Sequence, residues 1–468
     1  MLFTRFYDED LAQASYLIGC QATGEAAVVD PRRDAHVYID EAEKNDMKIV
    51  AVTETHIHAD YLSGARELAA AAGAALYLSD EGDTDWKYGF EGEKLYDGDE
   101  IEIGNIVLKA VHTPGHTPEH ISFLVTDGAT ANEPGIMLTG DFVFVGDLGR
   151  PDLLDEAAGG KDTRYIGAKQ MFASLRDKFL TLPDYVQVWP GHGAGSACGK
   201  ALGAVPSSTV GYEKTFAWWS QYVKENNEQA FVDMLLEGQP DAPVYFGRMK
   251  RQNKGGPALL GDRPGLHHYE PGELQEKLRA GEVTFIDTRG VDSYLKGAVP
   301  GALFVPGGKS FATWAAWVID PERAYAPIVL LARDGADAEG LRDKLSYVGI
   351  DNVEGYVTSL EGIEKEPVPT VTPKDLDKVE DAYILDVRTK NDFAAGNIPN
   401  ARQLHGGRVL WNLDELPKGE AIVTHCQTGA RSAVVASMLR ASGFEGVAEL
   451  EGSYDGWKKA QEGQKASV

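Results

Sequence analysis

The pattern of apolar and polar residues in the first part of the chain predicts alternating strands and helices. Residues 11–30 alternate between apolar and polar positions around Ala22-Thr23-Gly24-Glu25, as the two strands of a hairpin do. Further predicted segments are strands at Ile49–Val52, Ala75–Leu78 and Ile101–Val111, and a helix at Arg66–Ala72. Because the two kinds of segment alternate to about residue 195, this region is predicted to be an α/β domain with local hairpins.

A mainly helical pattern follows over residues 206–246. Its large aromatic side chains are expected to pack onto the first domain, and they are Phe216, Trp218, Trp219, Tyr222 and Phe231. The stretch from Gly255 to Gly265 is rich in glycine and proline, so it is predicted to be a linker.

The second half of the chain contains an internal repeat. Three pairs of segments correspond: Thr284–Arg289 with Tyr383–Arg388, Gly297–Ala302 with Gly396–Ala401, and Ile328–Leu331 with Ile422–His425. A period of roughly 100 residues indicates duplicated domains rather than the units of a solenoid. The expected domains therefore cover residues 1–255, 266–365 and 372–465.

Composition narrows the class of protein. A chain of 468 residues is too long for one ordinary hydrophobic core, and 43% hydrophobic with 25% charged residues is typical of a globular protein. The net charge of −27 argues against nucleic-acid binding, because that binding depends on Lys and Arg at the phosphates. An anion can still bind in a local pocket, where backbone dipoles or single arginines act at short range.

The number of cysteines and the length of the apolar runs indicate the cell compartment in which the protein is expected. The start of the chain lacks the pattern of a signal peptide, and no apolar run approaches the length of a membrane span. Cys20, Cys198 and Cys426 are too few and too widely spaced for a disulfide framework, which suits a reducing compartment. We expect a cytoplasmic protein without membrane segments that forms a homo-oligomer. Cys20, within the predicted hairpin, is expected to be structural.

The segment Thr55–Tyr61 carries the pattern His-x-His-x-Asp-Tyr just after a predicted strand. His56, His58 and Asp60 occupy alternate positions, so they can turn toward one point, as a metal site requires. Tyr61 stands where a third histidine completes the signature of two-metal hydrolases. A phenol with a pKa near 10 is a poor replacement for imidazole at a divalent ion. Tyr61 therefore favours a site with one metal ion.

Three later segments each place one potential metal ligand in a turn after a predicted strand. They supply His116 in Thr113-Pro114-Gly115-His116, Asp141 in Leu138-Thr139-Gly140-Asp141, and His192 in Val188-Trp189-Pro190-Gly191-His192. Together with the first motif, four loops are expected to converge on one metal centre.

These motifs resemble the metallo-β-lactamase superfamily over residues 1 to about 250. Within it, the segment is similar to the persulfide dioxygenases, whose single iron is held by two histidines and one aspartate. The resemblance implies an αββα sandwich in which His56, His116 and Asp141 bind one Fe(II). Two imidazoles and one carboxylate on one face leave positions for a sulfur ligand and O₂.

The remaining motif residues have alternative roles. His58, Asp60 and His192 are expected to steer ligands around one iron, whereas in a competing two-metal site they would bind zinc. Arg150, in a loop that resembles one near the iron in this family, would meet a substrate carboxylate, orient nearby acids or form a surface salt bridge. Cys198, six residues beyond His192, is either a buried small apolar residue or a thiol that accepts or relays sulfur.

A second reactive site is predicted at Cys426, which follows a strand and precedes a helix over Ala433–Ala441. Backbone N–H groups at a helix N-terminus lower the pKa of a thiol and bind anions. Arg431 closes the loop with a fixed positive charge. The loop alone would also suggest a tyrosine phosphatase, but Asp386–Arg388 and Glu451–Trp457 resemble a rhodanese domain. The resemblance implies that Cys426 carries a sulfane sulfur, with Arg431 as its catalytic partner.

The first copy of the repeat lacks both groups. Aligning Gly349 with Gly443 places Ala332 at the position of Cys426, and Asp337 falls at the position of Arg431. We expect a catalytically silent rhodanese-like domain whose role is spacing, dimerisation or the shaping of a channel.

Taken over the whole chain, the architecture resembles bacterial fusions of a persulfide dioxygenase with one silent and one active rhodanese domain. The first hypothesis is an enzyme of sulfide detoxification that oxidises a thiol persulfide to sulfite with O₂ and forms thiosulfate at Cys426. The second is a dinuclear zinc thioester hydrolase of the glyoxalase II kind fused to a sulfurtransferase. The third is a non-enzymatic sulfur-relay module. The expected small-molecule partners are the persulfide of glutathione, coenzyme A or bacillithiol, O₂, sulfite and thiosulfate.

Overall fold

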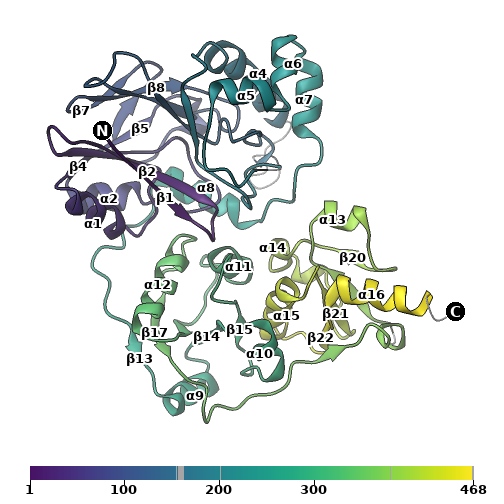
Figure 1. Cartoon of the computed structure of the whole chain (residues 1–468). Coiled ribbons are helices and arrows are strands. Elements are labelled where there is room, and N and C mark those ends of the chain that lie inside the picture. Colours follow the sequence, from purple (N-terminus) through teal and green to yellow (C-terminus); the bar gives the residue numbers. More distant parts are fainter. Residues whose placement is uncertain (154, 156–162, 201, 380, 466–468) are drawn as a thin grey trace. The chain divides into compact units, whose positions relative to one another are not determined.

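The computed structural model describes residues 1–153, 155, 163–200, 202–379 and 381–465 (Figure 1). Its internal contacts divide the chain into two compact units. The first unit comprises residues 1–242 and 246–263, and the second comprises residues 243–245 and the chain from residue 264 onward.

The first sheet of the first unit has six strands in the order β1-β2-β3-β4-β5-β6. It is antiparallel from β1 to β3 and parallel from β3 to β6. Its strands are β1 (Leu2–Asp8), β2 (Gln13–Cys20), β3 (Glu25–Val29), β4 (Lys48–Thr53), β5 (Ala75–Ser79) and β6 (Glu93–Leu95). The predicted hairpin and the predicted strands at Ile49–Val52 and Ala75–Leu78 are confirmed.

The second sheet also has six strands, in the order β12-β11-β10-β9-β8-β7. Neighbouring strands are antiparallel except β10 and β11, which are parallel. Its strands are β7 (Glu100–Ile103), β8 (Ile106–His112), β9 (Ile121–Asp127), β10 (Ile136–Gly140), β11 (Gln187–Pro190) and β12 (Ser208–Thr209). The carboxyl ends of β8, β10 and β11 lead directly into the loops of the predicted metal ligands.

Helices cover the outer face of each sheet, and the inner faces share an apolar core (Figure 1). The first sheet packs against α1 (His36–Lys44) and α2 (Ala65–Ala72). The second packs against α4 (Thr163–Ser174), the π-helical turn Leu175–Phe179, α5 (Val210–Phe216), α6 (Ser220–Lys224) and α7 (Glu228–Leu236). The predicted αββα sandwich is confirmed.

The aromatic residues after position 206 mostly pack as predicted. Trp219 and Phe231 are fully buried in the core over the second sheet, and Trp218 and Tyr222 pack against it. Phe216 is the exception, because its side chain is 69% exposed. It lies at the last residue of α5 and contacts the ring of Tyr212 one turn earlier at 4.8 Å, so both rings lie on the solvent face of the helix.

The predicted linker is not free chain. Residues up to 263 belong to the first unit, after α8 (Tyr245–Gly255). Arg33 Nη2 donates to the carbonyl of Ala258 at 2.7 Å, and the Glu67 carboxylate accepts from the N–H groups of Leu260 and Gly261 at 2.6 and 3.0 Å. Glycine and proline indicate irregular backbone, but they do not reveal partners that lie about 190 residues away in sequence.

The second unit contains two five-stranded, all-parallel sheets with the same topology, ordered β13-β17-β16-β14-β15 and β18-β22-β21-β19-β20. The first has β13 (His267–His268), β14 (Thr284–Asp287), β15 (Leu303–Phe304), β16 (Ile328–Leu331) and β17 (Val353–Val357). The second has β18 (Thr370–Val371), β19 (Tyr383–Asp386), β20 (Arg402–Gln403), β21 (Ile422–His425) and β22 (Val447–Leu450). The prediction that the repeat forms two rhodanese-like α/β domains is confirmed.

Helices flank both sheets of the second unit. They are α9 (Pro271–Ala280), α10 (Val291–Lys296), α11 (Phe311–Val318), α12 (Gly335–Ser346), α13 (Lys390–Ala395), α14 (Gly406–Val409), α15 (Ala430–Ala441) and α16 (Ser453–Lys465). Helix α15 begins at Ala430 rather than at the predicted Ala433. None of the helices in the described part of the chain has the length and apolar composition that crossing a bilayer requires.

The two copies contact each other through helix α15. Helix α11 of the first copy packs against α14 and α15 of the second. The backbone N–H of Phe304 donates to Ser437 Oγ at 2.9 Å, and Arg440 Nη2 donates to the hydroxyl of Tyr294 at 2.7 Å. Ser437 and Arg440 both belong to α15, so the first copy supports the helix that follows Cys426.

Candidate metal centre and sulfur-transfer site

Three of the predicted ligands meet at one point. Ligand atoms of His56, His116 and Asp141 lie within 4.8 Å of one another, and all three residues are buried. The Nε2 atoms of His56 and His116 lie 3.9 and 3.5 Å from Asp141 Oδ2. That oxygen is buried, and among the residues that the structure describes it has no hydrogen-bond partner. A buried, unpaired carboxylate oxygen is costly unless a cation faces it, so this donor set fits a metal ion.

The hydrogen bonds of the two histidines leave Nε2 free on each ring. His116 Nδ1 lies 2.9 Å from the carbonyl oxygen of Arg150, so Nδ1 must donate and Nε2 keeps its lone pair. His56 Nδ1 lies 2.9 Å from Thr55 Oγ1, whose own hydrogen goes to the carboxylate of Asp30 at 2.9 Å. Thr55 therefore accepts from His56, which fixes the same tautomer. Such partners orient metal-binding imidazoles.

The charge states also suit metal binding. Burial, together with the neighbouring histidines, holds the pKa of His56 well below its ordinary value. Burial likewise lowers the pKa of His116, although Asp141 opposes the effect. Burial would raise the pKa of Asp141, but His192 and His116 hold it well below its usual range. The centre thus presents two neutral imidazoles and one carboxylate, the forms that bind metal ions.

His192 is held between two carboxylates. Its Nδ1 lies 2.7 Å from Asp141 Oδ1, and its Nε2 lies 2.8 Å from Asp60 Oδ2. Burial disfavours a charged ring, but the two carboxylates raise the pKa of His192 well above its ordinary value. An imidazolium donates from both nitrogens and offers no lone pair to a metal ion.

A second group of potential ligands consists of Asp60, His192 and Cys198, whose ligand atoms also lie within 4.8 Å of one another. Cys198 is buried, and burial together with Asp60 raises the pKa of its thiol well above the ordinary value. Asp60 Oδ1 is buried and finds no hydrogen-bond partner in the described part of the chain. This group could hold a metal ion only if His192 released a proton.

Tyr61 and His58 take part in neither group. The fully buried Tyr61 hydroxyl donates to the carbonyl of Asp30 at 3.2 Å and accepts from Gln13 Nε2 at 3.2 Å. His58 Nε2 lies 3.1 Å from Asp30 Oδ1. Both side chains are therefore anchored to the loop after β3.

Arg150 is buried completely, so the alternative of a surface salt bridge is wrong. Its guanidinium pairs with Asp152 through Nε at 2.8 Å and through Nη2, and its Nη1 donates to the carbonyl of Ala197 at 3.3 Å. The backbone of the same residue accepts from His116 and donates to the carbonyl of Cys198. Arg150 thus joins the loops of His116 and Cys198, which the sequence pattern did not reveal.

Two further residues at this centre were missed by sequence reasoning. His120 Nε2 accepts from the backbone N–H of Asp141 at 3.1 Å, and its ring stacks on that of His56 at 5.1 Å. Its position four residues after His116 in the same loop was an available signal. Asn253 of α8 donates from Nδ2 to the carbonyls of His58 and Tyr61, both at 2.7 Å, and its Oδ1 accepts from Ser63 N–H at 2.9 Å. No local pattern marks an amide so distant in sequence.

Cys426 lies at the predicted loop between β21 and α15. Its buried Sγ accepts from the backbone N–H of Gly429 at 3.1 Å, and Ser432 Oγ lies 3.7 Å away. Burial raises the pKa of this thiol, but Arg431 and the N–H donors outweigh it and lower the pKa below that of free cysteine. Ser453, which sequence reasoning did not single out, accepts from the Cys426 N–H at 3.1 Å. The loop thus stabilises a thiolate.

Comparison with known proteins identifies the families of the domains. Residues 8–192 match the model of the metallo-beta-lactamase superfamily. The crystal structure of a metallo-beta-lactamase from Staphylococcus aureus subsp. aureus COL is 41% identical, covers 76% of this chain and 99% of its own, and aligns with a TM-score of 0.66. The chain belongs to the metallo-beta-lactamase superfamily. Residues 270–366 and 372–460 each match the model of the rhodanese-like domain.

Two curated relatives of the metallo-beta-lactamase domain have different activities. The mitochondrial persulfide dioxygenase of Bos taurus is 24% identical over 200 residues, which cover 41% of this chain and 68% of that protein. The hydroxyacylglutathione hydrolase of Rhodospirillum rubrum is 32% identical over 177 residues, which cover 38% of this chain and 60% of that protein. Relatedness alone therefore leaves a dioxygenase and a hydrolase as candidates.

The first rhodanese-like domain lacks the reactive groups of the second. Ala332 follows β16 as Cys426 follows β21. The Asp337 carboxylate accepts hydrogen bonds from the backbone N–H of Arg333, at 2.9 Å, and from the Arg333 guanidinium. A carboxylate therefore takes the place of the Arg431 cation, and no thiol is present at this loop.

Proposed function

We propose that the chain is a one-iron persulfide dioxygenase fused to a sulfurtransferase. The observation that carries the proposal is the geometry of the first centre. His56, His116 and Asp141 present free donor atoms to one point, while Tyr61 is anchored elsewhere and both ring nitrogens of His192 lie against carboxylates. One Fe(II) bound there would supply open coordination positions at which a persulfide sulfur and O₂ come together.

The protein's own residues prepare this site. Thr55 and the Arg150 carbonyl hold the two imidazoles in one tautomer, and the two N–H groups of His192 orient Asp141 and Asp60. Burial of all these groups excludes bulk water. The proposed net reaction converts a thiol persulfide, O₂ and water into the free thiol and sulfite. The carrier thiol is proposed to be glutathione, coenzyme A or bacillithiol.

The proposed second reaction takes place at Cys426. Its thiolate attacks the outer sulfur of a persulfide, forming a new sulfur–sulfur bond while the carrier leaves as a thiolate. Sulfite then attacks the outer sulfur on Cys426, which releases thiosulfate and restores the Cys426 thiolate. The Gly429 N–H and the charge of Arg431 stabilise this anion in both steps. Because both sites lie on one chain, sulfite formed at the first is available to the second at a raised local concentration.

A dinuclear zinc thioester hydrolase is the second candidate. The group formed by Asp60, His192 and Cys198 favours it, because a second ion could bind there, and the relative from Rhodospirillum rubrum is a hydrolase. This candidate requires a neutral His192, whereas two carboxylates at 2.7 and 2.8 Å favour its charged form.

Metal content and oxygen uptake distinguish the two candidates. The full chain is purified without oxygen, iron and zinc are counted per chain, and O₂ uptake is followed with glutathione persulfide or coenzyme A persulfide. One iron with uptake is expected, whereas two zinc ions without uptake would refute the dioxygenase. The Cys426→Ser variant is expected to consume O₂ normally and to release sulfite in place of thiosulfate. Normal thiosulfate production by this variant would show that Cys426 is not the sulfur carrier.

A further inference from the structure

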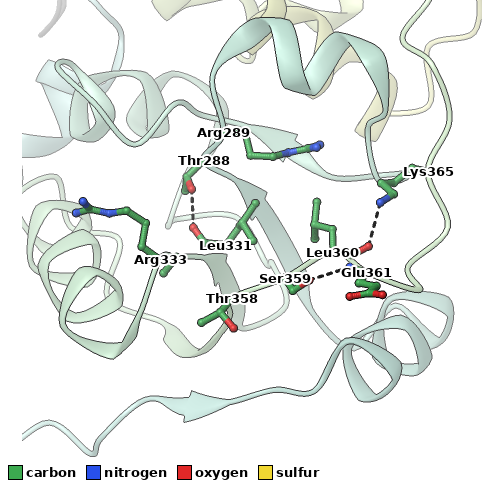
Figure 2. Close-up of a pocket in the computed structure, with 10 residues that line it drawn as sticks. Thr288, Arg289, Leu331, Arg333, Thr358, Ser359, Leu360, Glu361 and Lys365 are labelled. Atoms are coloured by element: carbon green, nitrogen blue, oxygen red, sulfur yellow. Dashed lines mark hydrogen bonds between the residues drawn. The ribbon is translucent and has the colours of Figure 1, made fainter.

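The silent rhodanese-like domain contains a cavity of about 620 Å³ at the carboxyl ends of its central strands (Figure 2). In open parallel sheets, ligands bind at this edge. Its lining includes the cations Arg289, Arg333 and Lys365 and the carboxylate Glu361. Each arginine also has an aspartate partner.

The active domain shows how the equivalent arginine is used when a rhodanese loop is complete. Arg388 pairs with Asp386, and its Nη2 also donates to the carbonyl of Gly396 at 2.8 Å. Its Nη1 donates to Gln427 Oε1 at 3.1 Å, and the ring of Tyr454 covers its guanidinium at 4.1 Å. Every edge of this arginine is therefore occupied by the protein.

Arg289 has the same anchors but not the same cover. It pairs with Asp287, and its Nη2 donates to the carbonyl of Gly297 at 2.6 Å. In the sequence alignment that pairs Gly349 with Gly443, Arg333 and Leu360 stand at the positions of Gln427 and Tyr454. Arg333 pairs with Asp337. Within the described residues, Arg289 Nη1 has no hydrogen-bond partner. The change at the position of Gln427 thus leaves one edge of a rigidly held guanidinium uncovered at the wall of the cavity (Figure 2).

Lys365 provides a second free donor on the same side. Its Nζ donates to the carbonyl of Leu360 at 3.0 Å, which leaves two of its three hydrogens available. A Cβ placed on Gly297 would lie 3.6 Å from Lys365 Cβ, so this lysine stands next to the residue that anchors Arg289. Figure 2 shows the Arg289 and Lys365 side chains on one side of the cavity, with Arg333 on the other.

We propose that this cavity binds a small oxoanion, held by Arg289 Nη1 and Lys365 Nζ. A carboxylate and a sulfur oxoanion share the required chemistry, which is a pair of acceptor oxygens that can face one guanidinium edge and one ammonium group. Such a headgroup could belong to an inorganic sulfur oxoanion or to the carboxylate of a thiol carrier. The silent domain would then be a binding domain whose anion donors are groups that the active domain uses for internal contacts.

The proposal is tested on the full chain carrying Cys426→Ser, which cannot be loaded with sulfur. Thiosulfate and glutathione are titrated separately by calorimetry, and hydrogen exchange locates the protected segments. Binding of either probe with protection of residues 288–297 and 358–365 is expected. Thiosulfate alone binding would identify the inorganic source, and glutathione alone would identify the carrier. Binding of neither probe, or protection confined to the Cys426 loop, would overturn the proposal.

Two variants change the proposed binding site without breaking the buried Asp287–Arg289 pair. Lys365→Gln removes one charged donor and is expected to weaken binding about tenfold. The double variant Arg333→Gln/Leu360→Tyr rebuilds the cover found over Arg388 and is expected to abolish binding. Lys277→Gln is the matched control, because this lysine lies on α9, pairs with Glu282 and does not line the cavity. Equal affinities of the Lys365→Gln and Lys277→Gln proteins would contradict the assignment.

Discussion

Replacing Asn253 tests whether a side chain of α8 holds the metal-binding loop in place. Its amide makes three hydrogen bonds, to the carbonyls of His58 and Tyr61 and to the N–H of Ser63. All three partner residues are at least 96% buried, so water cannot easily replace the amide. With about 1 kcal/mol for each bond, Asn253→Ala is expected to destabilise the loop by about 3 kcal/mol.

Hydrogen exchange is the suitable assay, because a chain with two compact units does not unfold in one step. A loss of about 3 kcal/mol corresponds to roughly a hundredfold faster exchange of the amides in residues 55–65. Iron bound per chain is expected to fall with it, since second-layer contacts of this kind change metal affinity by about 10- to 100-fold.

Asn45→Ala is the matched control. Asn45 follows α1 and donates to the backbone carbonyl and the side chain of Glu41, away from the metal centre. This variant should lose helix-end hydrogen bonds but exchange normally at residues 55–65. If Asn253→Ala also exchanges normally there, or if both variants lose iron equally, the loop does not depend on Asn253.

Three other predictions follow from single side chains. Tyr61→Phe should keep its full iron content, because the Tyr61 hydroxyl is bonded to Asp30 and is not directed at the metal centre. The free energy of unfolding should fall by about 1 kcal/mol. A clear fall in iron per chain would contradict this placement. Arg431→Gln should move the midpoint of the pH–rate profile of sulfur loading to higher pH, since Arg431 helps to lower the pKa of Cys426; an unchanged midpoint would show that the N–H donors suffice. Burial raises the pKa of Glu449 to about 8 against the opposing charge of Arg440. The folded state then keeps a proton that the unfolded state releases, so stability should fall as pH rises from about 4.5 to 8. Glu449→Gln should flatten this dependence in urea unfolding of the second unit, and an equally steep curve would refute the cause.

The sequence predicted those features that depend on short segments. The apolar runs before His56, Asp141 and Cys426 are strands, and each predicted ligand or nucleophile does follow a strand end. The expectation that His56, His116 and Asp141 meet also agrees with the structure, because the carboxyl ends of their strands open onto one edge of the sandwich. The metal ion and its chemistry remain predictions.

What the sequence did not reveal depends on contacts between distant segments. Asn253 lies 190 residues from Ser63, and the segment after α8 is tied to α2 across a similar separation. A surface salt bridge was one of the roles expected for Arg150, because its sequence neighbours do not show that its side chain is buried. The hydrophobic pattern also placed Phe216 in the core, although helix α5 ends with that ring facing solvent. Periodicity predicts which residues share a face, and it leaves open which face meets the core.

The contacts of α15 have a consequence for the history of the duplicated half. After a duplication, a copy that loses its nucleophile is free to accumulate changes or to be deleted. Here the backbone of Phe304 and the hydroxyl of Tyr294 bond to α15, most of whose residues are buried. Deleting the inactive copy would remove hydrogen-bond partners and packing contacts of α15, the helix that begins beside Cys426. The first copy can therefore serve the second as structural support for α15, a role that needs no nucleophile of its own.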